Sequence, residues 1–417
     1  MTGKERVETV LSHREADKIA VDFGATPVTG IHVKMIAGFR NYYGLEDRPV
    51  KVVEPFQMLG EVDDELAAIW KTDIVGVGGQ TDMFGHRQEN FMEMRMPWGQ
   101  TVLLPDSFKM KEKNGNIYVF PQGDTKCQPT AVMPAGGYFF DAIERTPATE
   151  LDAALNIEDN LEEFSLMCDA DMPYSKNALT KARATKKAVI ANIGGTGIGD
   201  IALVPGLHLK NPKGIRAIAD WYMSTAMRAD FLREIFDRQS DIAVQNLEKV
   251  NQSAGDCIDI LYVCGTDLGA QDGQFCSAET LSGLYGPAYR KINNWIHRNT
   301  KWKTFKHCCG AIVPLLDTFI DCGFDIINPV QINAAGMEPH FLKKKFGDRI
   351  SFWGGGIDTQ YVLQLGTPQD VKKQVRQMCE IFGAGGGFIF NTVHNLQANV
   401  PLENAFALMD QICEINQ

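Results

Sequence analysis

The sequence predicts an α/β fold of the TIM (β/α)8 barrel type, in which eight parallel strands alternate with helices. Eight short apolar runs recur along the chain, and each is followed by a polar or glycine-containing turn. Most of these runs are continuously apolar rather than alternating, which is typical of parallel strands covered on both faces. Stretches with a helical pattern lie between the runs. This strand–helix alternation favours a barrel over other α/β folds.

The first predicted element is a helix that begins at a capping box. Thr2 stands three residues before Glu5, and this spacing predicts a helix running to about His13. The eight predicted strands cover residues 19–23, 73–77, 188–193, 258–264, 304–308, 325–328, 350–354 and 388–391. The clearest later helices cover residues 212–250 (in two pieces), 278–300, 311–322, 367–382 and 402–415. We therefore expect one barrel domain over residues 1–417.

One connection is too long for a simple crossover. Roughly a hundred residues separate the second and third predicted strands, far more than one helix requires. Residues 92–96 alternate in the manner of a half-buried strand, and Asn114-Gly115 is a strong turn signal before residues 116–120. We predict a β-rich insertion at about residues 85–185, on the loop side of the barrel, with helix from about Asn160.

Composition narrows the classes of partner. The formal net charge of -11 argues against nucleic acid or an anionic membrane as the main partner. No apolar run approaches the roughly 20 residues of a membrane-spanning helix, and the first residues do not resemble a secretory signal. Ten cysteines in a chain without such a signal fit a reducing cytoplasm rather than a disulfide framework. We therefore expect a cytoplasmic protein.

A candidate metal site lies at two strand ends. His307 and Cys309 end the fifth predicted strand, and His394 follows the eighth. Active sites of TIM barrels form at the carboxyl ends of the strands, so these side chains are expected to meet there. Three ligands leave one position open, as in catalytic zinc sites, and thiolate with imidazole suits zinc better than magnesium or calcium. Gln331 is a candidate for a weak fourth ligand. The alternative is that Cys308 and Cys309 are small core residues and His307 caps a strand.

Other strand ends carry carboxylates and amides. Asp267 and Asp272 follow the fourth strand and Asp358 follows a glycine triplet after the seventh. We expect these carboxylates to orient or protonate the substrate; the alternative is that they cap the helices that follow. The amide side chains expected to bind the substrate are Gln271, Gln331 and Asn391. The glycine-rich residues 194–199 lack the dinucleotide-binding spacing, so we interpret them as a strand-end loop near the substrate.

At these residues the chain resembles the uroporphyrinogen decarboxylase superfamily, and within it the corrinoid-dependent methyltransferase branch. The matching segments run nearly from end to end, and the insertion matches least. They are residues 6–23, 267–273, 307–310, 325–331, 352–360 and 391–404.

The resemblance implies a TIM barrel and, in the methyltransferase branch, zinc bound by a His-x-Cys pair and a cysteine on the last strand. His307 and Cys309 match the pair, His394 stands where the third ligand is expected, and Gln331 stands near an acidic residue of the family. The true decarboxylases carry arginines after the first strand, whereas residues 24–30 here contain none. A tetrapyrrole with many carboxylates requires such cations, so porphyrinogen decarboxylation is not expected.

The function expected from the resemblance is a zinc-dependent methyltransferase. It would move a methyl group between a small substrate (a methyl ether, a methylated alcohol or a thiol) and a corrinoid, methylcobalamin, carried by a separate protein. Two alternatives stay open: a metal-free decarboxylase of a small acid, and a non-catalytic binding barrel.

Overall fold

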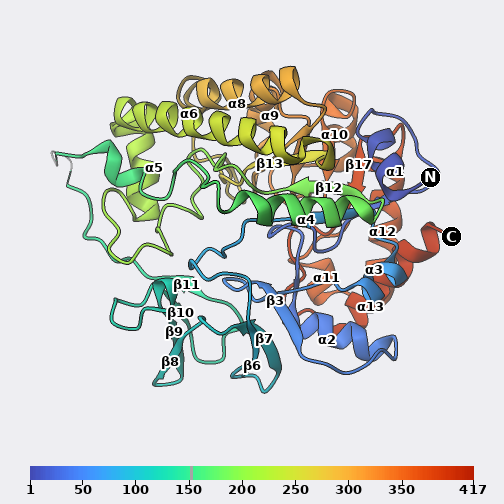
Figure 1. Cartoon of the computed structure of the whole chain (residues 1–417). Helices are drawn as coiled ribbons and strands as arrows, with labels where there is room; N and C mark the ends of the chain where they lie inside the picture. Colours follow the sequence, from blue (N-terminus) through green and yellow to red (C-terminus); the bar gives the residue numbers. More distant parts are fainter. Residues whose placement is uncertain (151–153) are drawn as a thin grey trace.

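The computed structural model describes residues 1–150 and 154–417, and a parallel eight-stranded barrel forms its centre (Figure 1). All eight predicted strands are present, so the predicted TIM barrel is confirmed. In their order around the sheet, the strands are β1 (Ala20–Val21), β17 (Phe388–Phe390), β16 (Ser351–Trp353), β15 (Ile326–Asn328), β14 (Lys303–His307), β13 (Ile260–Cys264), β12 (Ala188–Ala191) and β5 (Ile74–Val77).

The barrel closes where its first and second strands meet. The backbone N–H of Asp73, just before β5, donates to the carbonyl of Val21 in β1 at 2.8 Å. The Asp73 carboxylate accepts the N–H of Val21 at 2.9 Å and pairs with Arg6 of the first helix. Above this contact Gly76 lies directly against the carbonyl of Ala25. The seam is thus held by a few contacts rather than by a full ladder.

Apolar side chains fill the barrel interior on the side away from the carboxyl ends of the strands. Alternate residues of the strands point inward, and Ile190, Ile260, Phe305 and Trp353 belong to one buried cluster there. Tyr262 stacks on Phe305 with a ring-centroid distance of 5.1 Å. This cluster fills the interior on that side, and the cavity beside His307 lies at the carboxyl ends of the strands.

Helices cover the outside of the barrel, and the chain termini lie side by side (Figure 1). The predicted capping box at Thr2 is confirmed, as is the division of the 212–250 stretch into two helices. The helices are α1 (Gly3–Val10), α2 (Val33–Tyr42), α3 (Asp64–Trp70), α4 (Met172–Ala184), α5 (Ile218–Met227), α6 (Ala229–Ala254), α7 (Ala278–Thr280), α8 (Gly286–Asn299), α9 (Val313–Asp321), α10 (Pro339–Phe346), α11 (Val362–Leu365), α12 (Pro368–Gly383) and α13 (Leu402–Ile415).

The helix predicted from about Asn160 is wrong in its start. Residues Ile157–Asn160 form a single 3-10 turn, and α4 begins at Met172. The Asn160 side chain donates to the carbonyl of Ile215 at 2.9 Å and accepts the N–H of Ile215 at 3.0 Å. This buried tertiary pairing holds the segment in a connecting conformation.

A β-rich layer lies to one side of the barrel (Figure 1). Six of its strands fall between β5 and β12, as predicted: β6 (Phe91–Arg95), β7 (Thr101–Pro105), β8 (Met110–Lys113), β9 (Asn116–Val119), β10 (Ala131–Met133) and β11 (Asp141–Ala142). The predicted turn at Asn114-Gly115 joins β8 to β9, with both residues at positive φ. Residues 151–153 of the expected insertion lie outside the described part of the chain.

The sequence did not predict that the segment between β1 and β5 would join this layer. It contributes β2 (Ile31–His32), β3 (Val50–Glu54) and β4 (Leu59–Gly60). The strands β2, β4 and β3 pair in that order, and β3 pairs with β7, which pairs with β6. The five strands form one sheet. Two separate loops of the barrel therefore build the layer.

His32 connects this layer to α2 as a neutral imidazole. Its Nδ1 accepts the N–H of Lys34, and its Nε2 donates to the carbonyl of Tyr138 at 3.0 Å. Burial lowers the pKa of His32 to about 4. Since the unfolded chain binds this proton near pH 6.5, acidification from pH 6.5 to 4 favours unfolding.

His32→Asn keeps a helix cap but does not titrate. We expect this variant to lose less stability than the parent chain when the pH falls from 7 to 5. Between pH 7 and pH 5 the difference in the change of unfolding free energy should reach about 2 kcal/mol. Urea unfolding at pH 7 and pH 5 measures it. Parallel loss of stability in both proteins would contradict the assignment.

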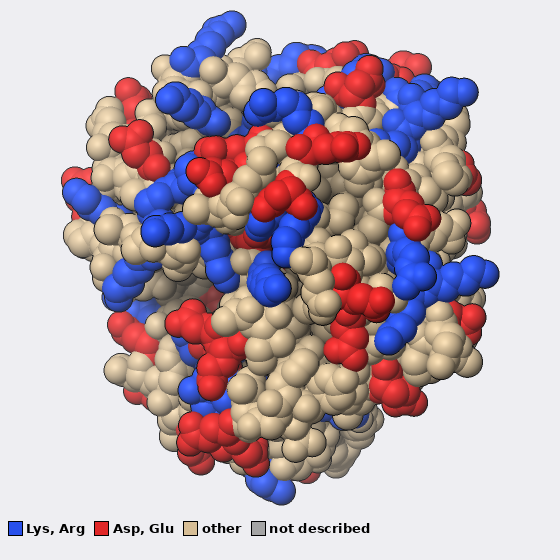
Figure 2. All heavy atoms as spheres, turned by 90° about the vertical axis from the view of Figure 1, so that its right-hand side faces the viewer, with Lys and Arg blue, Asp and Glu red and all other residues tan. Residues whose placement is uncertain are grey.

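Charges of both signs are interspersed over the face that carries the two termini, without a continuous basic patch there (Figure 2). Over the described residues, none of the helices combines the length and apolar character needed to cross a bilayer.

Candidate metal centre

The end of β14 carries the two residues predicted as a ligand pair. Side chains alternate along a strand, so His307 and Cys309 share one side and Cys308 takes the other. Cys308 is fully buried in the core, and its sulfur accepts the N–H of Leu268 at 3.2 Å. The His-x-Cys spacing therefore delivers one imidazole and one thiol to the same side of the turn.

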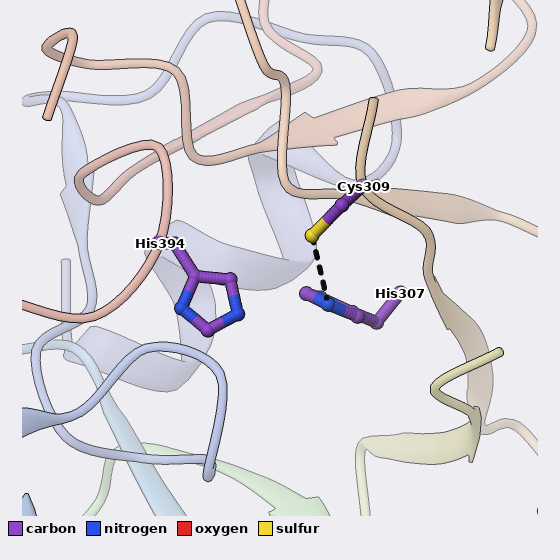
Figure 3. Close-up of side chains that lie close together, drawn as sticks. All are labelled: His307, Cys309 and His394. Carbon is purple, nitrogen blue, oxygen red and sulfur yellow. Dashed lines mark hydrogen bonds between the residues drawn. The ribbon is translucent and has the colours of Figure 1, made fainter. Parts of the chain in front are cut away.

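The structure brings the three predicted ligands together (Figure 3). Ligand atoms of His307, Cys309 and His394 all lie within 4.8 Å of one another. The Cys309 sulfur lies 3.4 Å from Nε2 of His307, and the two imidazole rings lie 5.3 Å apart at an interplanar angle of 75°. Two ligands of a tetrahedral zinc are separated by about 3.5 Å, so the His307–Cys309 pair has the required spacing.

His307 is oriented by a residue behind it. Its Nδ1 lies 2.6 Å from Oδ1 of Asn328, at the end of β15. The Asn328 amide nitrogen donates to the carbonyl of Trp353 at 2.9 Å, which fixes the amide oxygen toward the imidazole. Nδ1 therefore carries the ring proton, and the lone pair of Nε2 faces Cys309. Such outer contacts commonly fix the tautomer of a metal-binding histidine.

His394 is less prepared for metal binding. Its Nδ1 accepts the backbone N–H of Asn395 at 2.8 Å, which places the ring proton of the neutral imidazole on Nε2. The other ring nitrogen points toward His307 and Cys309 (Figure 3). Coordination through Nε2 requires the contact with Asn395 to open, so His394 is the weaker ligand of the three.

Asp267 lies beside the pair. Its Oδ1 accepts the N–H of Cys309 at 2.6 Å and lies 3.7 Å from Nε2 of His307. The carboxylate thus holds the turn at Cys309 and also places a negative charge next to the candidate metal position.

Burial keeps the three groups neutral without a metal. It lowers the pKa of His307, and it lowers the pKa of His394 to about 4. Burial also raises the pKa of the Cys309 thiol well above its ordinary value. Both imidazoles are neutral, with His307 already in the tautomer that coordinates through Nε2, and a cation is needed to stabilise the Cys309 thiolate. The donor set therefore fits zinc.

A cavity of ≈ 680 Å³ opens beside the centre and lies between the barrel and the β-rich layer. His307, His394 and Asp267 line it from the barrel side. Phe139 and Phe140 line it from the β-rich layer, whose strands therefore form the opposite wall. The predicted strand-end loop also reaches this cavity through Gly195, Thr196 and Gly197.

The structure does not bring the other two predicted carboxylates to the cavity. Asp272 is exposed on a tight turn that an isolated bridge between Gly269 and Gln274 closes. Asp358 is buried, and its Oδ1 accepts the N–H groups of Gln360 and Tyr361 at 2.8 and 3.2 Å. These bonds hold the turn before α11, whose N-cap residue is Tyr361 and which has no side-chain cap, so Asp358 is not the helix cap of the alternative interpretation either.

The three predicted substrate-binding amides hold loops together. Gln331 accepts the N–H of Gly310 at 2.8 Å and donates to Gln271 at 2.9 Å, which secures the turn after Cys309. Asn391 is fully buried and donates to the carbonyl of Asp22 at 2.7 Å, which links β17 to β1. None of the three lies among the described residues that line the cavity.

Sequence reasoning missed the supporting role of Asn328 and the cavity carboxyls Glu54, Asp82 and Asp200. For Asn328 the signal was its place at a strand end. Asp200 directly follows the glycine-rich loop at residues 194–199. Glu54 and Asp82 carried no comparable signal, because the β-rich layer that places them has no counterpart in a plain barrel.

We expect Asn328→Ala to weaken zinc binding by about 10- to 100-fold, because the His307 tautomer is then no longer fixed. Asn328→Asp, which retains an acceptor for Nδ1–H, should keep most of the affinity. Competition with a chromogenic chelator measures both. Equal losses in the two variants would show that Asn328 does not act through this hydrogen bond.

Comparison with known proteins places this site within a known family's sequence pattern. The profile of the uroporphyrinogen decarboxylase (URO-D) family matches residues 207–415, which include all three candidate ligands. A uroporphyrinogen decarboxylase of Pseudoalteromonas translucida (strain TAC 125) is 30% identical over 74 residues, which are 18% of this chain and only 20% of that relative. A solved structure, described as a methyltransferase from Methanosarcina mazei, covers 99% of both chains with a TM-score of 0.54 and 14% identity. At that identity the likeness establishes the shared fold.

Proposed function

Because the chain belongs to the uroporphyrinogen decarboxylase family, we propose that it is an enzyme of that family's methyltransferase type. In this proposal the protein binds zinc and moves a methyl group between a small substrate and a corrinoid carried by a separate protein. The substrate is a methyl ether, a methylated alcohol or a thiol.

One observation carries the proposal: His307, Cys309 and His394 converge within 4.8 Å at the carboxyl ends of the strands. A family member that only decarboxylates has no evident need for a thiol between two neutral imidazoles. Zinc bound there would supply a Lewis acid that polarises the oxygen or sulfur of the substrate. The full-length fold shared with the Methanosarcina mazei protein, itself described as a methyltransferase, agrees with this reaction class.

The chain's own residues would position the reactants. Asp267 holds the Cys309 backbone and lies 3.7 Å from Nε2 of His307, so its carboxylate stands next to the reacting atoms. It is the one predicted carboxylate placed to exchange a proton with the substrate. Phe139 and Phe140 form part of the far wall of the cavity.

A spectroscopic assay with free cobalamin tests the proposal. Zinc-loaded protein should convert methylcobalamin in the presence of a small thiol, or methylate cob(I)alamin from a small methyl donor, and removal of zinc should stop the reaction. Release of carbon dioxide from a small acid without cobalamin would instead support the decarboxylase alternative. Absence of turnover together with absence of ligand binding would support a non-catalytic barrel.

A further inference from the structure

The charge of the cavity is one-sided. Among its described lining residues there is no Lys or Arg. The carboxyl groups in the lining are those of Glu54, Asp82, Asp141, Asp200 and Asp267. The cavity wall therefore offers negative charge without a balancing cationic side chain.

Asp200 is bound by backbone amides on the barrel side. Its Oδ1 accepts the N–H of Ala202 at 3.0 Å, and its Oδ2 accepts the N–H of Gly265 at 2.8 Å. Burial raises the pKa of Asp200. Lys306 is the nearby cation, but its ammonium lies in the core behind the wall and donates to the carbonyls of Thr266 and His307. Asp200 thus faces the cavity without an ion-pair partner among the described residues.

Glu54 and Asp82 repeat this arrangement on the wall formed by the β-rich layer and the loop after β5. Backbone N–H groups of Phe56 and Gln57 bind Glu54, and both Phe84 and His86 donate to Oδ1 of Asp82 at 2.9 Å. Burial raises the pKa of Glu54 to about 6 and that of Asp82 to about 7, and Glu54 adds to the shift of Asp82. Two half-buried carboxyls without a cationic side chain beside them among the described residues are costly unless a ligand supplies the positive charge.

Aromatic rings stand in the same wall. Phe139, which is 46% exposed, and the half-buried Phe56 line the cavity, whereas Phe140 is fully buried behind them. Ring faces attract cations, most strongly where water is excluded. Carboxyls combined with accessible aromatic rings are typical of sites that bind a methylated ammonium group.

We propose that the small ether, alcohol or thiol bound at this site also carries a positively charged quaternary or protonated ammonium group, and that Glu54, Asp82 and Asp200 balance that charge. This inference rests on the proposed function, because it takes the cavity beside the metal centre as the substrate site. A zinc dication there is already offset by the Cys309 thiolate and the Asp267 carboxylate. Of the four other carboxyls, Asp141 is exposed on β11, so Glu54, Asp82 and Asp200 are left for the substrate. Their charge disfavours anionic substrates such as carboxylates or sulfonates.

Three probes of nearly equal shape test the charge. Choline carries a trimethylammonium group, 3,3-dimethylbutan-1-ol replaces its nitrogen with carbon, and 3,3-dimethylbutanoate is an anion. Calorimetric titration into the zinc-loaded full chain should show choline binding at least about tenfold tighter than the alcohol, a preference typical of cation recognition by carboxyls and aromatic faces, with the anion weakest. Choline binding no tighter than the alcohol, or no choline binding in the millimolar range, overturns the proposal.

Asp82→Asn provides the matched variant, because both backbone contacts go to Oδ1, which asparagine retains. It should reduce the preference for choline over the alcohol by about three- to tenfold while leaving the binding of the alcohol unchanged, which also reports correct folding. Glu54→Gln should act in the same direction. Glu112→Gln, on the exposed strand β8 outside the cavity, should have no effect.

The same titration on zinc-free protein separates this inference from the proposed function. If the protein prefers choline but neither binds zinc nor transfers a methyl group, the cation site is supported and the proposed metal chemistry is contradicted. If the protein transfers methyl groups but prefers the alcohol or the anion, the proposed function is supported and the cation site is contradicted.

Discussion

Replacing His307 with alanine is expected to weaken zinc binding by more than about 100-fold and to abolish methyl transfer, because it removes the ligand whose lone pair is already aimed at the metal position. Oδ1 of Asn328 lies 2.6 Å from Nδ1 of His307 and keeps the ring proton there, so Nε2 can coordinate without rearrangement. Cys309→Ala should have an effect of similar size, since the thiolate is the charged member of the set. Titration with zinc in the presence of a competing chelator, together with the cobalamin assay, measures both.

Two neighbouring residues provide the controls. Cys308→Ala changes an adjacent thiol that points into the core, and it should leave zinc binding unchanged. His394→Ala should weaken zinc binding less than His307→Ala, because His394 must first release the N–H of Asn395. A Cys308→Ala variant that loses zinc as Cys309→Ala does would contradict the assignment of the pair.

The second large effect is expected at the barrel seam, where Gly76→Ala should destabilise the protein by more than about 3 kcal/mol. A Cβ at Gly76 would lie 1.7 Å from the carbonyl oxygen of Ala25, so the loop after β1 or the strand β5 must move. The clash is with backbone, which a change of side-chain rotamer cannot relieve. Urea unfolding monitored by circular dichroism gives the change in unfolding free energy.

Gly78→Ala is the matched substitution two residues along the same segment. A Cβ at Gly78 meets no atom of the described residues within 4 Å. Its unfolding free energy should stay within about 0.5 kcal/mol of the parent value, as for substitutions away from packed contacts. Equal destabilisation by the two substitutions would contradict the close approach of Gly76 to Ala25.

The barrel could be predicted from the sequence because its strands are buried on both faces. Runs such as Ala188–Ala191 and Ile260–Cys264 are apolar throughout and are each followed by a turn. The first half of the β-rich layer gave no such signal. The strands β2 and β4 are two residues long, and their pairing depends on contacts between distant segments. A periodicity of two residues cannot be recognised in so short a strand.

The candidate ligands could be located for two reasons. Side chains alternate along a strand, and active sites of TIM barrels lie at the carboxyl ends of the strands, so His307, Cys309 and His394 are expected to meet there. The same rule does not say which way a loop side chain points. Asp267 and Asp272 follow the same strand, yet Asp267 contacts Cys309 while Asp272 is exposed on a turn. The same reasoning predicts that the amides bind the substrate, whereas Gln331 accepts the backbone N–H of Gly310 in the neighbouring loop after β14. Local hydrogen bonding decides such cases, and the sequence does not reveal it.

The metal content of protein purified without chelator tests the central claim most directly. Inductively coupled plasma analysis of the parent chain should find about one zinc per chain, and His307→Ala should reduce this to background. Less than about a quarter equivalent of zinc in the parent chain, unchanged by His307→Ala, would contradict a zinc centre at these strand ends.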